Sequence, residues 1–126
     1  MLSHDALIER CLALSPDIRY VAVYRDEVLR TRERAGLAGA SATESDRYEE
    51  LLVNPTVLTL VRQRGNIDCG GVRYFVIRYG NFYQCVFPVS DGHVAVALEP
   101  TADLSRHLEL VQDKLREWVG YGMPAR

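Results

Sequence analysis

The sequence predicts an α+β fold with a five-stranded antiparallel sheet flanked by helices, in the order α-β-β-α-β-β-β-α. Stretches rich in β-branched and aromatic residues come in two groups, a pair within residues 18–34 and a trio within residues 72–98. Only short turns separate the strands within each group. Because such turns cannot hold a crossover helix, neighbouring strands are expected to be antiparallel. Segments with helical spacing precede, separate and follow the two groups.

The first half of this order is a helix and a β-hairpin. The helix is expected to begin at Ser3, whose hydroxyl can accept a hydrogen bond from a backbone amide, and to end at Pro16. The hairpin has strands at residues 18–24 and 28–34 around a polar turn at residues 25–27. One face of the second strand is expected to be exposed to solvent or covered by a partner.

A glycine-containing crossing leads to the central helical region. Ser41 and Glu44 have the spacing of a capping box, which predicts a helix start. Pro55 lacks an amide hydrogen and clashes with the preceding turn, so the helix is expected to kink or divide there. Asn54 would cap the second piece, and Gly65 is the expected C-terminal cap.

Three strands and a helix complete the chain. The strands are expected as a meander at residues 72–79, 82–89 and 93–98. The helix is expected to begin after Asp103 and to end at Gly120, with apolar residues at alternating steps of four and three between them. A single domain over residues 1–120 and a flexible tail at residues 121–126 follow from this.

Composition excludes several classes of protein. The 15 basic and 17 acidic residues give a net charge of −2, which provides no general field for nucleic acid or an anionic membrane. The three cysteines are too few for a disulfide framework or a zinc site, so we expect a reducing compartment and no cofactor. No apolar stretch is long enough for a signal peptide or a membrane span. The sequence predicts a cytoplasmic protein without nucleic-acid binding or membrane insertion.

Cys69 is the most enzyme-like residue, because it lies in a glycine-rich loop where a thiol is approachable. The adjacent Asp68 disfavours the thiolate that a nucleophile needs. The three histidines, His4, His93 and His107, are not spaced as metal ligands and are expected at surface or cap positions. No nucleophile, base and orienting group occur in one pattern, so we expect no catalytic centre.

Other polar and thiol side chains have structural interpretations. Glu49 and Glu50 are neighbours on the expected helix and point to different sides, which is typical of a solvated face. Cys11 and Cys85 follow the apolar pattern of a helix and a strand, and are expected to be small core residues.

Two features of the strands raise the question of a partner. Arg30, Arg32 and Arg34 share one strand face, which is either solvated or a docking patch for a carboxylate or phosphate group; charged exposed strand faces are common and favour the first. Aromatic residues of the meander fall on both faces of its strands: Tyr74, Tyr79, Phe82, Tyr83 and Phe87. One set must point away from a helix-covered core unless helices or a second chain cover both faces.

The order of elements over residues 3–120 resembles the roadblock and dynein light-chain family, whose profilin-like scaffold is related to longin domains. The matching features are the hairpin, the long central helix, the three-strand meander and the closing helix. The resemblance implies a non-catalytic homodimeric module that regulates or scaffolds a small GTPase or a motility or signalling complex. Pro55 departs from the family's usually continuous central helix.

The central helical region, residues 48–61, is apolar on more than one side, and one sheet can cover only one of them. The resemblance implies that a second copy covers the other side through its own helix and neighbouring strand. The expected interface comprises Leu51, Val57, Leu58, Val61, Arg73, Phe75 and Ile77. The alternatives are a monomer whose terminal helices cover this side, and a small-molecule sensor or thiol-dependent enzyme that uses the Cys69 loop.

Overall fold

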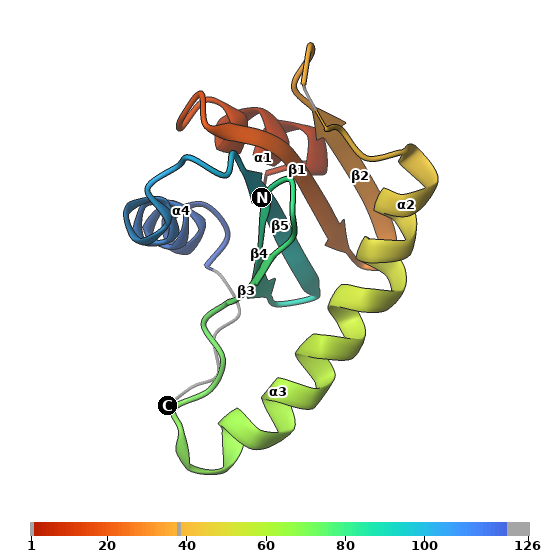
Figure 1. The fold of residues 1–126 in the computed structure, drawn as a ribbon. Coiled ribbons are helices and arrows are strands. Elements are labelled where there is room, and N and C mark those ends of the chain that lie inside the picture. Colours follow the sequence, from red (N-terminus) through yellow and green to blue (C-terminus); the bar gives the residue numbers. More distant parts are fainter. Residues whose placement is uncertain (1, 38, 121–126) are drawn as a thin grey trace.

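A computed structural model of the chain describes residues 2–37 and 39–120. Its strands are β1 (Ile18–Arg25), β2 (Val28–Glu33), β3 (Phe75–Arg78), β4 (Tyr83–Val89) and β5 (Gly92–Leu98). Its helical segments are α1 (His4–Leu12), α2 (Thr43–Tyr48), the π-helical turn η1 (Glu49–Val53), α3 (Asn54–Asp68) and α4 (Leu104–Val119). The strands form one antiparallel sheet in the order β2-β1-β5-β4-β3 (Figure 1). The predicted fold class and element order are confirmed, and the tail predicted at residues 121–126 lies outside the described residues.

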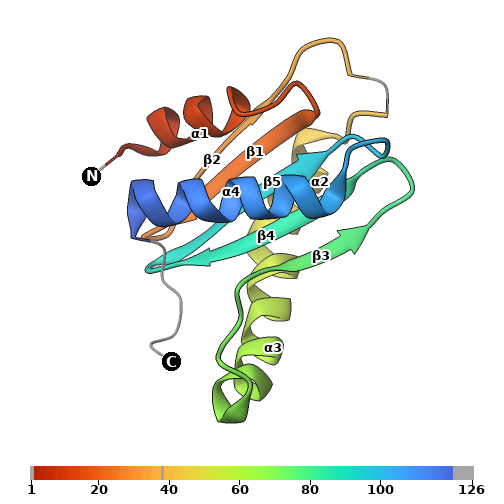
Figure 2. The same cartoon turned by 90° about the vertical axis from the view of Figure 1, so that its left-hand side faces the viewer.

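Helices cover both faces of the sheet. On one face lie α1 and α4 (Figure 2). On the other face α2, η1 and α3 run as one curved helix, and we call residues 43–68 the long helix (Figures 1 and 2). The end of α3 extends beyond the sheet, so the sheet covers only part of the long helix (Figure 2).

The main apolar core lies between the sheet and the helices α1 and α4. Its larger members are Leu7, Ile8, Ile18, Val21, Val23, Phe87, Val96, Leu98, Leu108, Val111 and Leu115. Cys11 and Cys85 are buried among them, and burial raises the pKa of both thiols to about 12. Both cysteines are therefore core residues, as predicted.

The caps that the sequence predicts for α1 and α4 are confirmed. The backbone N–H of Ala6 donates to Ser3 Oγ over 3.1 Å, and the backbone N–H of Arg106 donates to Asp103 Oδ1 over 3.2 Å. Gly120 ends α4 in the left-handed conformation at φ 54°. Side-chain caps and a glycine end thus fix both helices of this layer.

The predicted capping box at the start of the long helix is wrong. Ala42 is the N-cap and makes no side-chain cap hydrogen bond, because the helix begins one residue later than the box requires. Glu44 then falls on the second helical position instead of the third. Ser41 Oγ donates instead to Asp46 Oδ1 over 2.6 Å. Ser41 therefore ties the preceding loop to the first turn of the helix.

Pro55 does not interrupt the long helix, and the cap predicted on Asn54 is wrong. Asn54 has helical dihedral angles, and its backbone N–H donates to the carbonyl of Glu49, five residues earlier. This wider hydrogen-bonding pattern is the π-helical turn η1, which ends directly before Asn54 and Pro55. A π-helical turn is a known way for a helix to accept a local irregularity without ending. The chain therefore passes the proline as one curved helix (Figure 1).

The sequence predicts that Gly65 ends the long helix, but Gly65 lies inside it. The helix continues to Asp68, and the returning chain donates from the Gly71 N–H to the Gly65 carbonyl over 3.0 Å. A Cβ on Gly65 would lie 3.1 Å from Val72 Cγ2, which is tighter than most such contacts. The glycine therefore provides space for the chain to return along the helix. As a result residues 72–74 are not part of the strand, and β3 begins only at Phe75.

His107 is buried, contrary to the surface or cap position predicted for it. Its Nδ1 donates to the Asp103 carbonyl and its Nε2 accepts from Ser15 Oγ, both over 2.8 Å. The bond to Ser15 connects α4 to the loop after α1, and the bond to Asp103 stays within the first turn of α4. A histidine can be buried at the edge of a core when both of its ring nitrogens are hydrogen-bonded. The spacing of apolar residues does not show such partners, so it does not predict that His107 is buried.

Candidate functional site

A buried carboxylate lies between the long helix and the sheet. Glu50, in η1, is 0% exposed. Its Oε2 accepts from Tyr20 Oη over 3.1 Å and from Gln84 Nε2 over 3.2 Å. Its Oε1 accepts from Asn54 Nδ2 over 2.8 Å and bonds His93 Nε2 over 2.7 Å. We call these five side chains the polar cluster.

Every hydrogen bond in the polar cluster points toward Glu50. The oxygen atoms of a carboxylate accept, so the bond to His93 requires the tautomer that carries the proton on Nε2. Burial, with the charge of Glu50 added to it, raises the pKa of Tyr20, which keeps the phenol protonated as a donor. A buried carboxylate that binds this many donors holds the helix in one position on the sheet.

The predictions of a solvated Glu50 and of a surface position for His93 are therefore wrong. The sequence contains a signal that the strand pattern alone does not use. Gln84 and His93 lie on the same strand faces as Val86, Ala95 and Ala97, which pack beneath the long helix. Small residues beside polar ones on a strand face leave space for a polar side chain from a helix that covers the sheet. This combination is the signal in the sequence that could have indicated a buried polar cluster.

Leu58 supplies the apolar part of this attachment. It is 3% exposed and packs in a small cluster with Tyr20, Ala22, Val86 and neighbouring alanines of the sheet. The chain's own sheet thus covers Leu58, which the sequence assigns to an interface with a second copy.

The other side of the long helix is apolar and uncovered within one chain. Val53, Val57, Leu60 and Ile67 recur at helical steps, with Arg64 at the intervening position. Leu60 is 62% exposed and Ile67 is 70% exposed, while the two valines are half-buried. We call these four apolar side chains the outer stripe. Large apolar side chains gathered on one exposed helix face are typical of an interaction surface.

The other predicted interface residues lie on the long helix and on or just before β3. Leu51 is exposed and Val61 is half-buried on the long helix. On and before β3, Arg73 is exposed, and Phe75 and Ile77 are half-buried. β3 is an edge strand of the sheet, which leaves one row of its backbone groups outside the ladder. Phe75 packs against the cluster beneath Leu58, whereas the exposed side chains of the helix and the edge of β3 are accessible to a second chain.

Arg30, Arg32 and Arg34, which the sequence places on one strand face, do not act together. Arg30 and Arg32 are exposed. Arg34 is half-buried, and its guanidinium donates to the carbonyls of Leu12, Ser15 and Ile18 over 2.7, 3.2 and 2.8 Å. These bonds hold the end of α1 against β1, so the predicted docking patch is reduced to Arg30 and Arg32.

Cys69 is exposed at the C-terminal end of α3. Its Sγ donates to Asp68 Oδ1 over 3.4 Å, and the same oxygen accepts from Arg64 over 2.7 Å. Among residues 2–37 and 39–120, no group of His, Cys, Asp and Glu side chains is arranged to hold a metal ion, and no helix is long and apolar enough to cross a bilayer.

The fold is shared with solved structures, although no protein family and no curated protein matches the chain by sequence. A roadblock/LC7 domain from Streptomyces avermitilis superposes with a TM-score of 0.63 at 16% identity, over 90% of this chain and 95% of that one. MglB in a tetrameric arrangement gives 0.59 at 14% identity, over 90% and 85%. The gliding protein MglB from Thermus thermophilus gives 0.59 at 14% identity, over 90% and 86%. At these identities the likeness is one of fold, and the chain has the roadblock fold that its element order resembles.

Proposed function

We propose that the chain is a non-catalytic homodimeric interaction module that regulates or scaffolds a small GTPase or a motility or signalling complex. The observation that supports it most is the outer stripe, an apolar helix face that the chain leaves exposed while it holds the opposite side of the same helix on the sheet. A protein with this arrangement gains stability when a second chain covers the stripe.

A second copy of the same chain fits this surface. A two-fold axis would place the outer stripe of one copy against that of the other, with Leu51 and Val61 at its margin. The edge strand β3 would extend the contact through Phe75 and Ile77, and Arg73 would lie at the rim. Leu58 stays beneath the helix in this arrangement and contributes by holding the helix in place.

The GTPase part of the proposal is supported by the fold alone. The two MglB structures share this fold over 90% of this chain, and one is described as a gliding protein and the other as a tetrameric arrangement. The second of these descriptions names an oligomeric arrangement. Arg30 and Arg32, exposed on β2, are the proposed contact for acidic groups of a partner.

Sedimentation velocity tests both parts of the proposal. At micromolar concentration the chain alone is expected to sediment as a dimer. Small GTPases from the same organism, each loaded with GDP or with a non-hydrolysable GTP analogue, are then added in turn. One of them is expected to shift the boundary to a heavier complex, in one nucleotide state more than in the other. A monomer in the first run would overturn the dimer, and no shift with any GTPase would overturn the GTPase role.

A further inference from the structure

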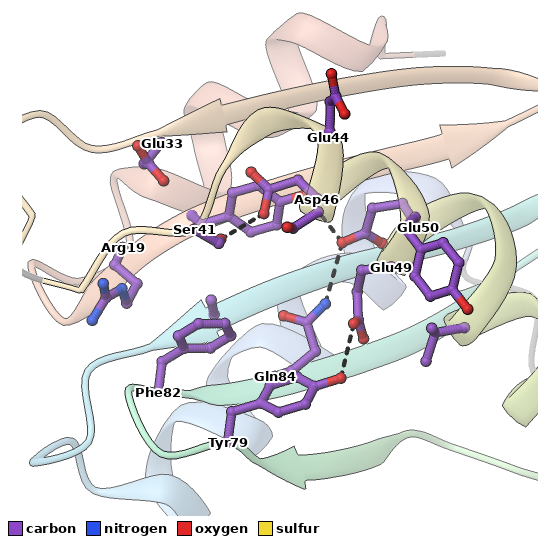
Figure 3. A pocket seen from close by; sticks show the side chains of 15 residues that line it. Arg19, Glu33, Ser41, Glu44, Asp46, Glu49, Glu50, Tyr79, Phe82 and Gln84 are labelled. Atoms are coloured by element: carbon purple, nitrogen blue, oxygen red, sulfur yellow. Dashed lines mark hydrogen bonds between the residues drawn. The ribbon is translucent and has the colours of Figure 1, made fainter.

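A pocket opens between the first half of the long helix and the ends of β1 and β4 (Figure 3). Its volume is about 530 Å³, within the range of sites for small molecules. It is formed by residues of one chain, and Val53, a member of the outer stripe, also lines it, so the pocket borders the proposed dimer surface. The pocket is lined by carboxylates from β2 and the long helix: Glu33, Glu44, Asp46, Glu49 and Glu50.

The charge of this pocket is strongly negative. Arg19 is the basic residue that lines it, and its Nη1 already donates to Glu99 Oε1 over 3.0 Å and to the Asn81 carbonyl over 3.2 Å. Burial raises the pKa of both Asp46 and Glu49, and the charge of Glu50 raises them further. The carboxylates therefore lie close enough to one another for their charges to interact.

Two residues that line the pocket, Glu49 and Gln84, each have a buried side-chain oxygen without a hydrogen-bond partner. Gln84 is 1% exposed, and its Nε2 is directed to Glu50, which fixes its Oε1 on the other side of the amide. That Oε1 accepts no hydrogen bond. Glu49 accepts from Tyr79 Oη through Oε1 over 2.8 Å, and its Oε2 likewise has no partner. Gln84 extends from the sheet into the space between Phe82 and Glu49 (Figure 3).

Both unpartnered atoms are acceptors, so a ligand that satisfies them must be a donor. A buried acceptor that loses its water without gaining a donor is costly, and a charged N–H donor compensates for that cost best. The walls also include aromatic rings. Tyr79 and Phe82 meet edge to face with their centroids 5.5 Å apart, which offers apolar surface next to the carboxylates.

We propose that this pocket binds a small organic cation with N–H donors, a guanidinium or primary ammonium compound on a short carbon chain. The head group would donate to Gln84 Oε1 and Glu49 Oε2, with Asp46 providing further negative charge. The carbon chain would lie against Tyr79 and Phe82. A metal ion fits less well, because no group of three or more metal-binding side chains converges within the described residues. A guanidinium or ammonium group can also come from a protein side chain, and the test below separates these two sources.

The test uses agmatine and putrescine as small cations in isothermal titration calorimetry on the full chain. Tetramethylammonium serves as a cation without N–H donors, and a blocked Gly-Arg-Gly peptide presents the guanidinium on a protein segment. The proposal expects agmatine or putrescine to bind, with tetramethylammonium and the peptide at least about tenfold weaker, the loss that accompanies one charge-assisted hydrogen bond. In NMR spectra the side-chain amide signals of Gln84 are expected to shift with the small cation.

Two variants locate the binding. Glu49→Gln keeps an acceptor for Tyr79 and removes one charge of the pocket. It is therefore expected to weaken the binding of agmatine about tenfold. Glu109→Gln, exposed on α4, removes one charge on the other side of the sheet and is expected to leave binding unchanged. The proposal is overturned if neither small cation binds at millimolar concentration, if tetramethylammonium binds as tightly, if only the peptide binds, or if the two variants behave alike.

Discussion

The two faces of the sheet are covered in different ways. Beneath α1 and α4 the contacts are apolar, and the helices that make them are closed by side-chain caps. On the other face the long helix, all of whose residues are described, buries Leu58 as its one large apolar side chain and is otherwise held by the polar cluster around Glu50. The first layer is complete within one chain. The second holds its helix by directional bonds and leaves the apolar residues of the outer stripe for another molecule.

The largest loss of stability is expected when Glu50, the shared acceptor of the polar cluster, is removed. Glu50→Ala leaves Tyr20, Asn54, Gln84 and His93 without their shared acceptor and opens a cavity. We expect a loss of about 3–5 kcal/mol in the free energy of unfolding, measured by urea denaturation. Leu115→Ala in the apolar core is the comparison and should cost about 2–5 kcal/mol through its cavity alone.

A loss below about 1 kcal/mol in Glu50→Ala would show that the polar cluster does not hold the long helix.

A substitution in the outer stripe is expected to change the stability of the single chain only slightly and to weaken the association of two chains strongly. Leu60→Glu places a charge on an exposed apolar position, so the unfolding free energy of the single chain should change by less than about 0.5 kcal/mol. The dimer should dissociate at least about 100-fold more readily, since a charge would be buried without a partner. Sedimentation equilibrium and circular dichroism measure the two effects.

Thr59→Glu is the matched control for that variant. Thr59 is also exposed and lies one residue earlier, about 100° around the helix from Leu60. It should keep the dimer. Equal dissociation in both variants would point to a general effect of charge on the helix and would argue against the outer stripe as the seam.

The layer that is complete within one chain is also the one that the sequence predicts well. The ends of α1 and α4 at Ser3, Asp103 and Gly120 follow from local hydrogen-bonding rules, and the strand pairs follow from turns that are too short for any other connection. These rules act over a few residues. They need no knowledge of which elements meet in space.

The long helix shows where such rules stop. Periodicity indicates that Leu58 and Leu60 lie on different apolar sides, but not which side meets the sheet, so the pattern places Leu58 at the interface. The pairing of Glu50 with His93 joins residues 43 positions apart and depends on the helix lying over β5. The end of the helix depends on a tertiary contact too, because Gly65 faces Val72 of the returning chain.

Hydrogen exchange at two protein concentrations tests most directly whether the long helix is completed by a second copy. The samples are taken well below and well above the dissociation constant, and amides of α3 are compared with those of α1. Protection of α3 between Val57 and Asp68 is expected to rise with concentration more than protection of α1, and Leu60→Glu should remove the difference. If the amides of α3 are equally protected at both concentrations in the unmodified chain, one chain suffices to stabilise the helix and the account is contradicted.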